Sequence, residues 1–202
     1  MNKSFSDMIE INGYCGVGLK GDKLKQLNQI KEETARAMAD IQDTKDIQEI
    51  AQIIRTSLEK EKIKYTMCVA FGDTQLKELQ TWIRDNKEHI IFLAFTESGH
   101  VAVVGKGNDL RFPKIKKNAS NETTRLLFKT KQKWDKNRSI VIYIKELNEN
   151  GEGVLKRIKG IETYIGEELL ENEVPIINAY SHRNWKMEYW NKWKENKYKY
   201  IK

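Results

Sequence analysis

Cysteine and histidine are scarce in this chain of 202 residues. The two cysteines, Cys15 and Cys68, lie far apart and neither belongs to a C-x-x-C unit, and the three histidines do not cluster. Disulfide frameworks and zinc sites draw on closely spaced residues of these types. The sequence therefore gives no support for a disulfide scaffold or a zinc site, and we expect two reduced thiols.

Long hydrophobic runs are also missing. No stretch approaches the roughly 18–20 apolar residues that a transmembrane helix needs, and no apolar signal core follows residues 1–7. We therefore expect a cytoplasmic protein with no membrane partner. The hydrophobic fraction of 39% suffices for a core, and the length fits one domain or one domain with an appendage.

Positive charge is abundant and unevenly placed. The net charge is +7, yet residues 1–62 contain 10 Lys/Arg against 11 Asp/Glu. Residues 106–138 contain 11 Lys/Arg against 3 Asp/Glu, and residues 181–202 contain 7 against 2. Such basic segments attract polyanions through counterion release and long-range steering. Nucleic acid, DNA in particular, is the expected partner, and a lysine-rich surface without a partner is the alternative.

Residues 1–86 are expected to be mainly helical with one strand. Apolar residues recur at helical spacing from Asp22, and a second helix carrying Ile47 to Leu58 is expected to be capped by Asp43 or Thr44. Residues 64–71 read as a strand, and a short helix capped by Asp73 or Thr74 follows.

Residues 87–180 form the second expected unit. Strands at 89–95 and 100–104 are joined by a turn at 96–99. A helix from about 121 to 134, a strand at 139–144 and a helix at 154–171 follow. A basic aromatic helix is expected within 181–202. This order predicts an α+β or mixed α/β fold rather than a doubly wound sheet. We expect an α+β fold with a small mixed sheet, in which a β-hairpin is flanked by helices.

Five short motifs in the second unit carry a family resemblance. Ile90-Ile91-Phe92 and Val103-Val104-Gly105 stand on the two hairpin strands, with Phe92 and Val103 eleven positions apart. Lys106 to Leu110 follow the second motif, and Ile161-Glu162 precedes Pro175-Ile176-Ile177-Asn178. This arrangement resembles the GIY-YIG nuclease family over residues 87–180.

The resemblance implies metal-dependent phosphodiester hydrolysis. Glu162 would hold Mg²⁺ and Asn178 would orient a ligand, with Glu167 as a second possible register for the glutamate. Arg111 would bind the phosphate, and Arg125 is the alternative candidate for this role.

The motif tyrosines are replaced in this chain. Phe92 and Val103 stand at the tyrosine positions and have no hydroxyl, so the family's usual means of activating water is missing. Lys106 or Tyr164 could substitute for it.

Basic and aromatic residues outside these motifs are candidates for strand binding. The tail interleaves aromatic residues with lysines, which suits base stacking, although Trp185, Tyr189 and Trp193 share the spacing of a packed helix face. The expected nucleic-acid-binding residues are Lys114, Lys116, Lys117, Arg125, Lys129, Lys131, Arg183 and Lys186.

Three functions stay open from the sequence. The first is a divergent nuclease acting on DNA, and the second is a nuclease-derived scaffold that binds without cutting. The third is an interaction protein that docks a partner through its N-terminal helices. Residues 16–21 also match G-x-G-x-x-G, but a helical stretch follows where a dinucleotide site needs a short βαβ unit.

Overall fold

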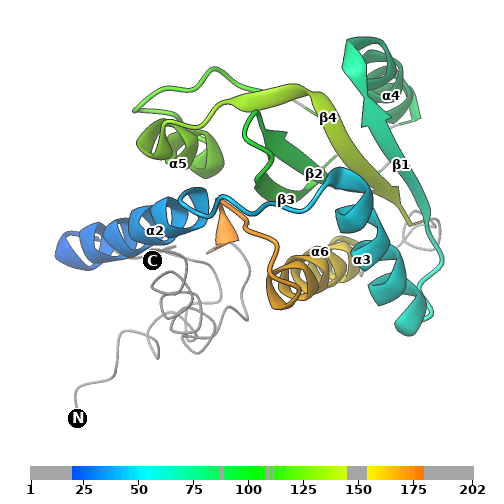
Figure 1. Ribbon diagram of the computed structural model, residues 1–202, viewed down its shortest axis with the longest axis horizontal. Coiled ribbons are helices and arrows are strands. Elements are labelled where there is room, and N and C mark those ends of the chain that lie inside the picture. Colours follow the sequence, from blue (N-terminus) through cyan, green and yellow to red (C-terminus); the bar gives the residue numbers. More distant parts are fainter. Residues whose placement is uncertain (1–19, 87–88, 108–109, 111, 145–153, 180–202) are drawn as a thin grey trace.

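The computed structural model describes residues 20–86, 89–107, 110, 112–144 and 154–179. Over these residues the chain has the expected α+β fold, with five helices around a four-stranded sheet (Figure 1). In chain order the elements are α2 (Asp22–Ala39), α3 (Ile47–Lys60), β1 (Thr66–Phe71), α4 (Gly72–Asn86), β2 (Ile90–Thr96), β3 (Val101–Gly107), α5 (Glu122–Thr130), β4 (Trp134–Tyr143) and α6 (Val154–Glu171).

The four strands lie in the order β1-β4-β2-β3, and each neighbouring pair is antiparallel. The mixed sheet that we expected is therefore wrong. A parallel contact occurs only as an isolated bridge between Val101 and Ile176 among the described residues. Helix α4 connects β1 to β2, and α5 connects β3 to β4. The two strands of each of these pairs run in the same direction but have another strand between them, so no parallel ladder forms.

One face of the sheet carries the main hydrophobic core. Ile91 and Leu93 of β2 lie opposite Ile142 and Ile140 of β4, and all four side chains are buried. Helices α3 and α6 cover this face and pack against each other. Buried residues of α2 and α3 join the same cluster, so the parts of the chain before and after residue 87 contribute to one core.

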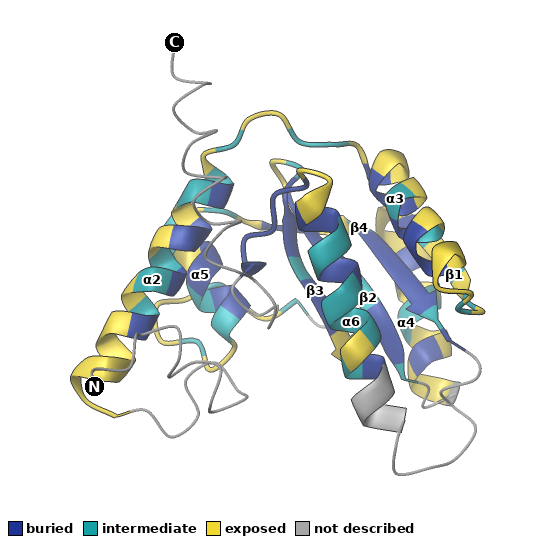
Figure 2. Cartoon of the chain, turned by 90° about the horizontal axis from the view of Figure 1, so that it is seen from below, coloured by how far each residue is buried: buried dark blue, intermediate teal, exposed yellow. Residues whose placement is uncertain are grey.

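The opposite face carries a smaller core under α4. Leu76 and Ile83 of this helix pack against Ala70, Ile90 and Val141 of the sheet. Figure 1 shows α4 on the other side of the sheet from α3 and α6, and Figure 2 shows burial concentrated on the strands and the helix sides facing them. Helix α4 packs on β1 and β4, which leaves the β2–β3 end of this face for the chain after β3.

Two helix boundaries differ from the sequence-based expectation. Helix α5 ends at Thr130, because Lys131 adopts a left-handed conformation (φ 56°) and its N–H donates to the Leu127 and Phe128 carbonyls. The predicted extension to residue 134 is wrong, and Trp134 already belongs to β4. The prediction of a helix over 154–171 is confirmed by α6.

Helix α3 is capped by Asp46 rather than by Asp43 or Thr44. The Asp46 carboxylate accepts from the N–H groups of Gln48 and Glu49, and the Glu49 side chain accepts from Asp46 N–H. This reciprocal pair satisfies N–H groups that the helix itself leaves unpaired. Thr44 lies instead beside the hairpin turn, with its Oγ1 2.8 Å from the position that a Cβ would take on Gly99.

Some expected elements lie outside the described residues, namely the glycine-rich run over 13–19 and the basic aromatic helix of 181–202. Among the described residues, no helix combines the length and the hydropathy needed to span a bilayer.

Candidate functional site

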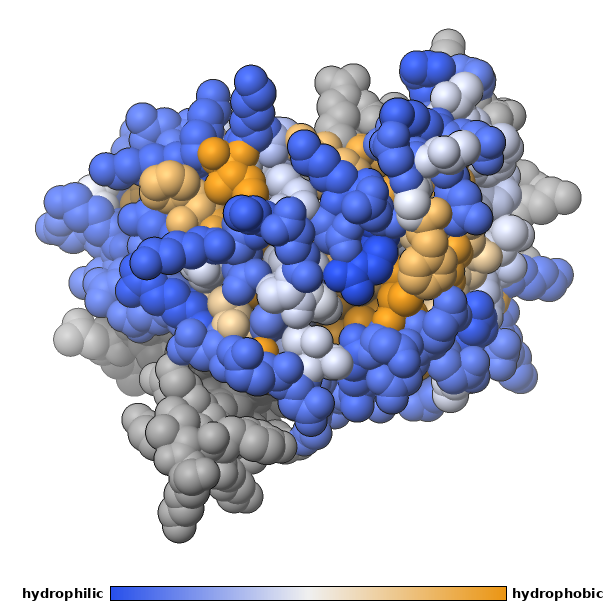
Figure 3. All heavy atoms as spheres, turned by 45° about the horizontal axis from the view of Figure 1, so that its top comes forward, coloured by the Kyte–Doolittle hydropathy of each residue, from blue (hydrophilic) through white to orange (hydrophobic). Residues whose placement is uncertain are grey.

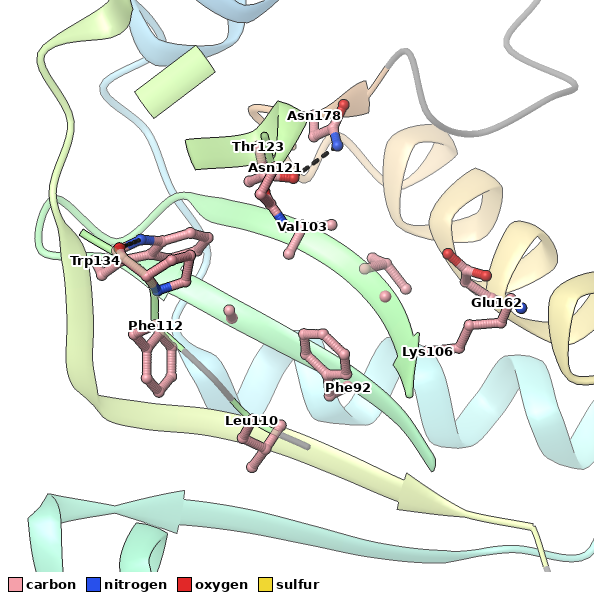
Figure 4. Close-up of a pocket in the computed structure, with 14 residues that line it drawn as sticks. Phe92, Val103, Lys106, Leu110, Phe112, Asn121, Thr123, Trp134, Glu162 and Asn178 are labelled. Carbon is pink, nitrogen blue, oxygen red and sulfur yellow. Dashed lines mark hydrogen bonds between the residues drawn. The ribbon is translucent and has the colours of Figure 1, made fainter. Parts of the chain in front are cut away.

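A cavity of about 260 Å³ lies along the β2–β3 hairpin, and residues from both faces of the sheet line it (Figure 4). Its walls come from both hairpin strands, the chain that follows β3, the start of α5 and β4, helix α6 and the segment after it. The lining residues are Phe92, Ala94, Val103, Val104, Gly105, Lys106, Leu110, Phe112, Pro113, Asn121, Thr123, Trp134, Glu162 and Asn178.

The floor of the cavity is formed by cross-strand pairs of the hairpin. Phe92 lies opposite Gly105, and Ala94 lies opposite Val103. Directly opposite residues in antiparallel strands project to the same face, so all four line the floor. A Cβ on Gly105 would lie 2.8 Å from the Phe92 ring, so the close approach of this ring to β3 requires glycine at position 105.

Aromatic residues form one wall. The rings of Phe112 and Trp134 meet edge to face, with centroids 5.7 Å apart and planes at 65°. The indole Nε1 of Trp134 donates to the Pro113 carbonyl (3.1 Å), which satisfies its polar atom. This wall is therefore apolar and is held in place by one hydrogen bond.

Asn178 lies on the polar side of the cavity and is buried, with 5% of its surface exposed. Its Nδ2 donates to Thr123 Oγ1 at 2.8 Å (Figure 4). Its backbone N–H donates to the Ala102 carbonyl, and the N–H of Ile177 donates to Val101. The segment after α6 is thus bonded along the outer edge of β3, and this pairing carries the amide of Asn178 to the start of α5.

Glu162 and Lys106 lie together on the α6 side of β3 (Figure 4). Glu162 is half-buried on α6, whereas Lys106 is exposed on β3. Burial raises the pKa of the Glu162 carboxyl, and the positive charges of Lys106 and Lys159 partly oppose this shift. The site therefore combines one carboxyl group in a poorly solvated position with a nearby ammonium group.

The cavity brings together most of the residues that the family resemblance singled out. Phe92, Val103, Gly105, Lys106, Glu162 and Asn178 all line it. Arg111 lies outside the described residues.

The sequence-based alternatives lie elsewhere. Glu167, the second register for the glutamate, is half-buried on α6 away from the cavity lining. The Tyr164 hydroxyl donates to the Ser57 carbonyl of α3 (3.3 Å).

Other cavity residues were missed in the sequence. Trp134 was assigned to the end of a helix, and Thr123 and Phe112 matched no motif. Asn121 was recognised only as the start of a helix, and its Oδ1 does accept from Thr124 N–H as an N-cap. The Thr123–Asn178 hydrogen bond joins residues far apart in the chain, and no local pattern marks such a contact.

The basic candidates divide into three groups. Arg125 and Lys129 of α5 face α2, where both approach the carboxylate of Glu32, at 3.9 and 3.3 Å. Arg183 and Lys186 lie outside the described residues, and the exposed candidates are Lys114, Lys116, Lys117 and Lys131.

A metal would find few protein ligands in the described part of the chain. No three His, Cys, Asp or Glu side chains gather there, and Glu162 is the one carboxylate among the lining residues. Mg²⁺ commonly keeps several waters and takes one or two carboxylates together with substrate phosphates. Among the described lining residues, Glu162 alone could supply such a carboxylate.

No protein-family model, no curated protein and no solved structure matches this chain. The fold and the cavity therefore carry the functional argument.

Proposed function

We propose that this protein binds nucleic acid, with DNA as the first candidate, through a GIY-YIG-like unit over residues 87–180. The observation that carries the proposal is the gathering of six motif-aligned residues around one cavity. The order of elements supports it as well, since the hairpin, α5, β4, α6 and the Pro175–Asn178 segment follow one another as the resemblance requires.

Phosphodiester hydrolysis is a second candidate function, favoured by the position of Glu162 beside Lys106. A bound Mg²⁺ would neutralise charge on the phosphate and stabilise the departing oxygen. Glu162 would hold this ion, and the Lys106 ammonium would offset the negative charge of the phosphate.

Binding is the better supported of the two functions. Phe92 and Val103 lie on the cavity floor at the two tyrosine positions, and neither side chain has a hydroxyl. Burial also raises the pKa of the Glu162 carboxyl, which makes its ionised form, the form that binds a cation, less favourable. The floor of this cavity can therefore contact a ligand by packing, but it cannot activate water by a hydroxyl group.

A paired binding and cleavage assay separates the two functions. The full chain would be incubated with plasmid DNA and with single-stranded oligonucleotides in Mg²⁺ or Mn²⁺, beside Glu162→Gln. The matched control is Glu171→Gln, which removes a carboxylate from an exposed position on the same helix.

Each function has its own expected result. Salt-sensitive binding without cleavage, indifferent to both substitutions, supports the binding function. Metal-dependent cleavage lost in Glu162→Gln and kept in Glu171→Gln supports hydrolysis. Absence of both binding and cleavage contradicts the proposal.

A further inference from the structure

The cavity has an aromatic lining that suits a flat ring. Phe92, Phe112 and Trp134 supply aromatic surface, while Ala94 and Val103 leave space between them. At about 260 Å³ the cavity lies below the roughly 300–1,000 Å³ typical of drug-sized ligand sites. A single heterocycle fits such a volume, whereas a base pair or a duplex does not.

Polar groups lie where they can reach the edge of such a ring. Asn178 and Thr123 lie on one side of the cavity, and Asn121 lies beside them at the start of α5. The Oδ1 of Asn121 already accepts from Thr124, so its amide NH₂ is the part that can turn towards a ligand. Amide groups of this kind form hydrogen bonds with the edges of nucleobases.

The chain leads directly from the aromatic wall to exposed positive charge. Phe112 and Pro113 line the cavity, and Lys114, Lys116 and Lys117 follow at exposed positions. Ile115 packs against the main core between them, which holds this segment to the body of the protein. Phosphates on either side of a bound base can therefore meet lysines next to the cavity mouth.

The competing basic surface on α5 is already neutralised within the chain. Arg125 and Lys129 lie within 4 Å of Glu32, and the Arg125 guanidinium also donates to Asn28 Oδ1 (3.1 Å). A polyanion would have to displace these contacts before binding there. The segment from Lys114 to Lys117 carries no such contact in the described structure and is the better site for phosphates.

We propose that the cavity binds one unpaired base of a single-stranded nucleic acid, stacked against its aromatic walls, while Lys114, Lys116 and Lys117 contact the flanking phosphates. This inference rests on the proposed nucleic-acid binding and specifies the form of the ligand. Stacking between bases and aromatic side chains, combined with a basic track, is the general means by which proteins hold single strands.

The test measures the affinity of the full chain for three fluorescent ligands by anisotropy. These are a single-stranded oligonucleotide, an abasic strand of the same length, and the corresponding duplex. Wild-type protein should bind the single strand about tenfold more tightly than the abasic strand, because one stacked base contributes about this factor. The duplex should bind more weakly than the single strand.

Two substitutions probe the cavity and one set probes the lysines. Val103→Phe fills the cavity without changing charge, and Phe112→Leu removes an aromatic wall while keeping it apolar. Each variant should bind the normal single strand only as tightly as wild-type protein binds the abasic strand. The salt dependence of binding should be the same as for wild-type protein. If the Val103→Phe variant does not unfold cooperatively in urea, it is not properly folded, and the cavity is then tested with Phe112→Leu alone.

Replacement of Lys114, Lys116 and Lys117 by alanine should weaken binding of every ligand and reduce its salt dependence. The matched control replaces the exposed Lys60 at the end of α3 and the exposed Lys62 and Lys64 in the connection to β1, and it removes the same charge. The control variant should retain wild-type affinity.

Four outcomes would overturn the inference. If wild-type protein binds normal and abasic strands equally, the base does not occupy the cavity. The same follows if both cavity variants still prefer the normal strand. Neither result would contradict nucleic-acid binding itself. A free nucleoside monophosphate could also displace the single strand when both are present at the same concentration of bases. The cavity would then be a site for free nucleotides rather than for a strand. No binding of any strand would contradict the proposed function itself.

Discussion

Gly105 is the residue at which the cavity depends on the absence of a side chain. Its missing Cβ leaves room for the Phe92 ring. We expect Gly105→Ala to lower the free energy of unfolding by about 1–3 kcal/mol, the usual cost of overpacking a filled site. Urea denaturation would measure it. In a protein that already carries Phe92→Leu, the methyl group added at position 105 meets a smaller side chain. If Gly105→Ala lowers the free energy of unfolding by the same amount in that protein, the contact with the Phe92 ring is not the cause of the loss.

His100 is buried at the hairpin turn and links it to the chain after α2. Its Nε2 is 2.7 Å from the Ile41 carbonyl, and its Nδ1 is 2.9 Å from Ser98 Oγ. Burial lowers the pKa of the ring, and the hydrogen bond to Ile41 partly opposes this shift. The folded protein therefore binds a proton on His100 less readily than the unfolded chain does.

This difference sets the direction of the pH dependence. Because the pKa of His100 is lower in the folded state, its contribution to stability is complete above about pH 6.5 and falls as the pH drops below that value. We expect wild-type protein to lose more free energy of unfolding between pH 7 and 5 than His100→Asn does. Parallel pH profiles of the two proteins would contradict this assignment.

At the scale of elements, α2 is attached to α5 partly through charge. Lys31 of α2, 4% exposed, lies 2.6 Å from the Glu122 carboxylate, which is 33% exposed. Thr34, Ala35 and Leu27 bury the apolar side of the same helix. Removing one member of a buried pair typically costs about 3–5 kcal/mol, because the other charge then loses its partner in a poorly solvated site.

We expect Glu122→Gln to lower the free energy of unfolding by about 2–3 kcal/mol, less than for a fully buried pair since Glu122 is partly exposed. The double variant Lys31→Met/Glu122→Gln should recover most of this loss, because the buried Lys31 ammonium that would lack its partner is then absent. Urea titrations of both variants and of Lys31→Met would complete the cycle. Additive losses would show that the two side chains are not coupled.

The elements also show which features could be read from the sequence. Helix α6 was predicted over its full range because its apolar residues recur at helical spacing along the whole helix. The end of α5 was not predicted, because the left-handed residue that ends it is Lys131 and not the glycine or asparagine that usually marks such a position. The cap of α3 was misplaced because Asp43, Thr44 and Asp46 are all good capping residues, and Thr44 is taken up by its contact with the turn.

The site divides along the same lines. Phe92, Gly105, Glu162 and Asn178 could be proposed as neighbours because they stand in recognisable motifs. Trp134 could not, since its place in the wall depends on β4 starting earlier than its apolar stretch suggests. The engagement of Arg125 and Lys129 by Glu32 also depends on how α2 docks, which no local pattern encodes.

For the whole molecule, the shared core ties both halves of the chain together. Met38, Ile50, Ile54 and Leu58 belong to the same buried cluster as the β2–β4 strands. Figure 3 shows a largely hydrophilic outer face broken by apolar patches. The described large apolar residues exposed by 36–45% are Leu24, Phe71, Trp82 and Phe128.

A chain that starts at residue 87 should therefore fail to unfold cooperatively. Each buried aliphatic side chain contributes about 1.5–3 kcal/mol, and the loss of several exceeds the roughly 5–15 kcal/mol by which domains are stable. Circular dichroism during thermal unfolding would measure this, and adding residues 1–86 as a separate chain should restore the transition. A cooperative transition in the fragment alone would show that residues 87–180 fold independently.

The position of β1 at the edge of the sheet has a consequence during synthesis. Thr66 to Phe71 leave the ribosome well before Arg138 to Tyr143, the only strand with which they pair in the described fold. Until then β1 is an unpaired strand that could join another chain. Lys60, Glu61, Lys62 and Lys64 immediately precede it, and charges beside an apolar strand discourage such pairing. These residues therefore protect the nascent chain during the interval in which its sheet is incomplete.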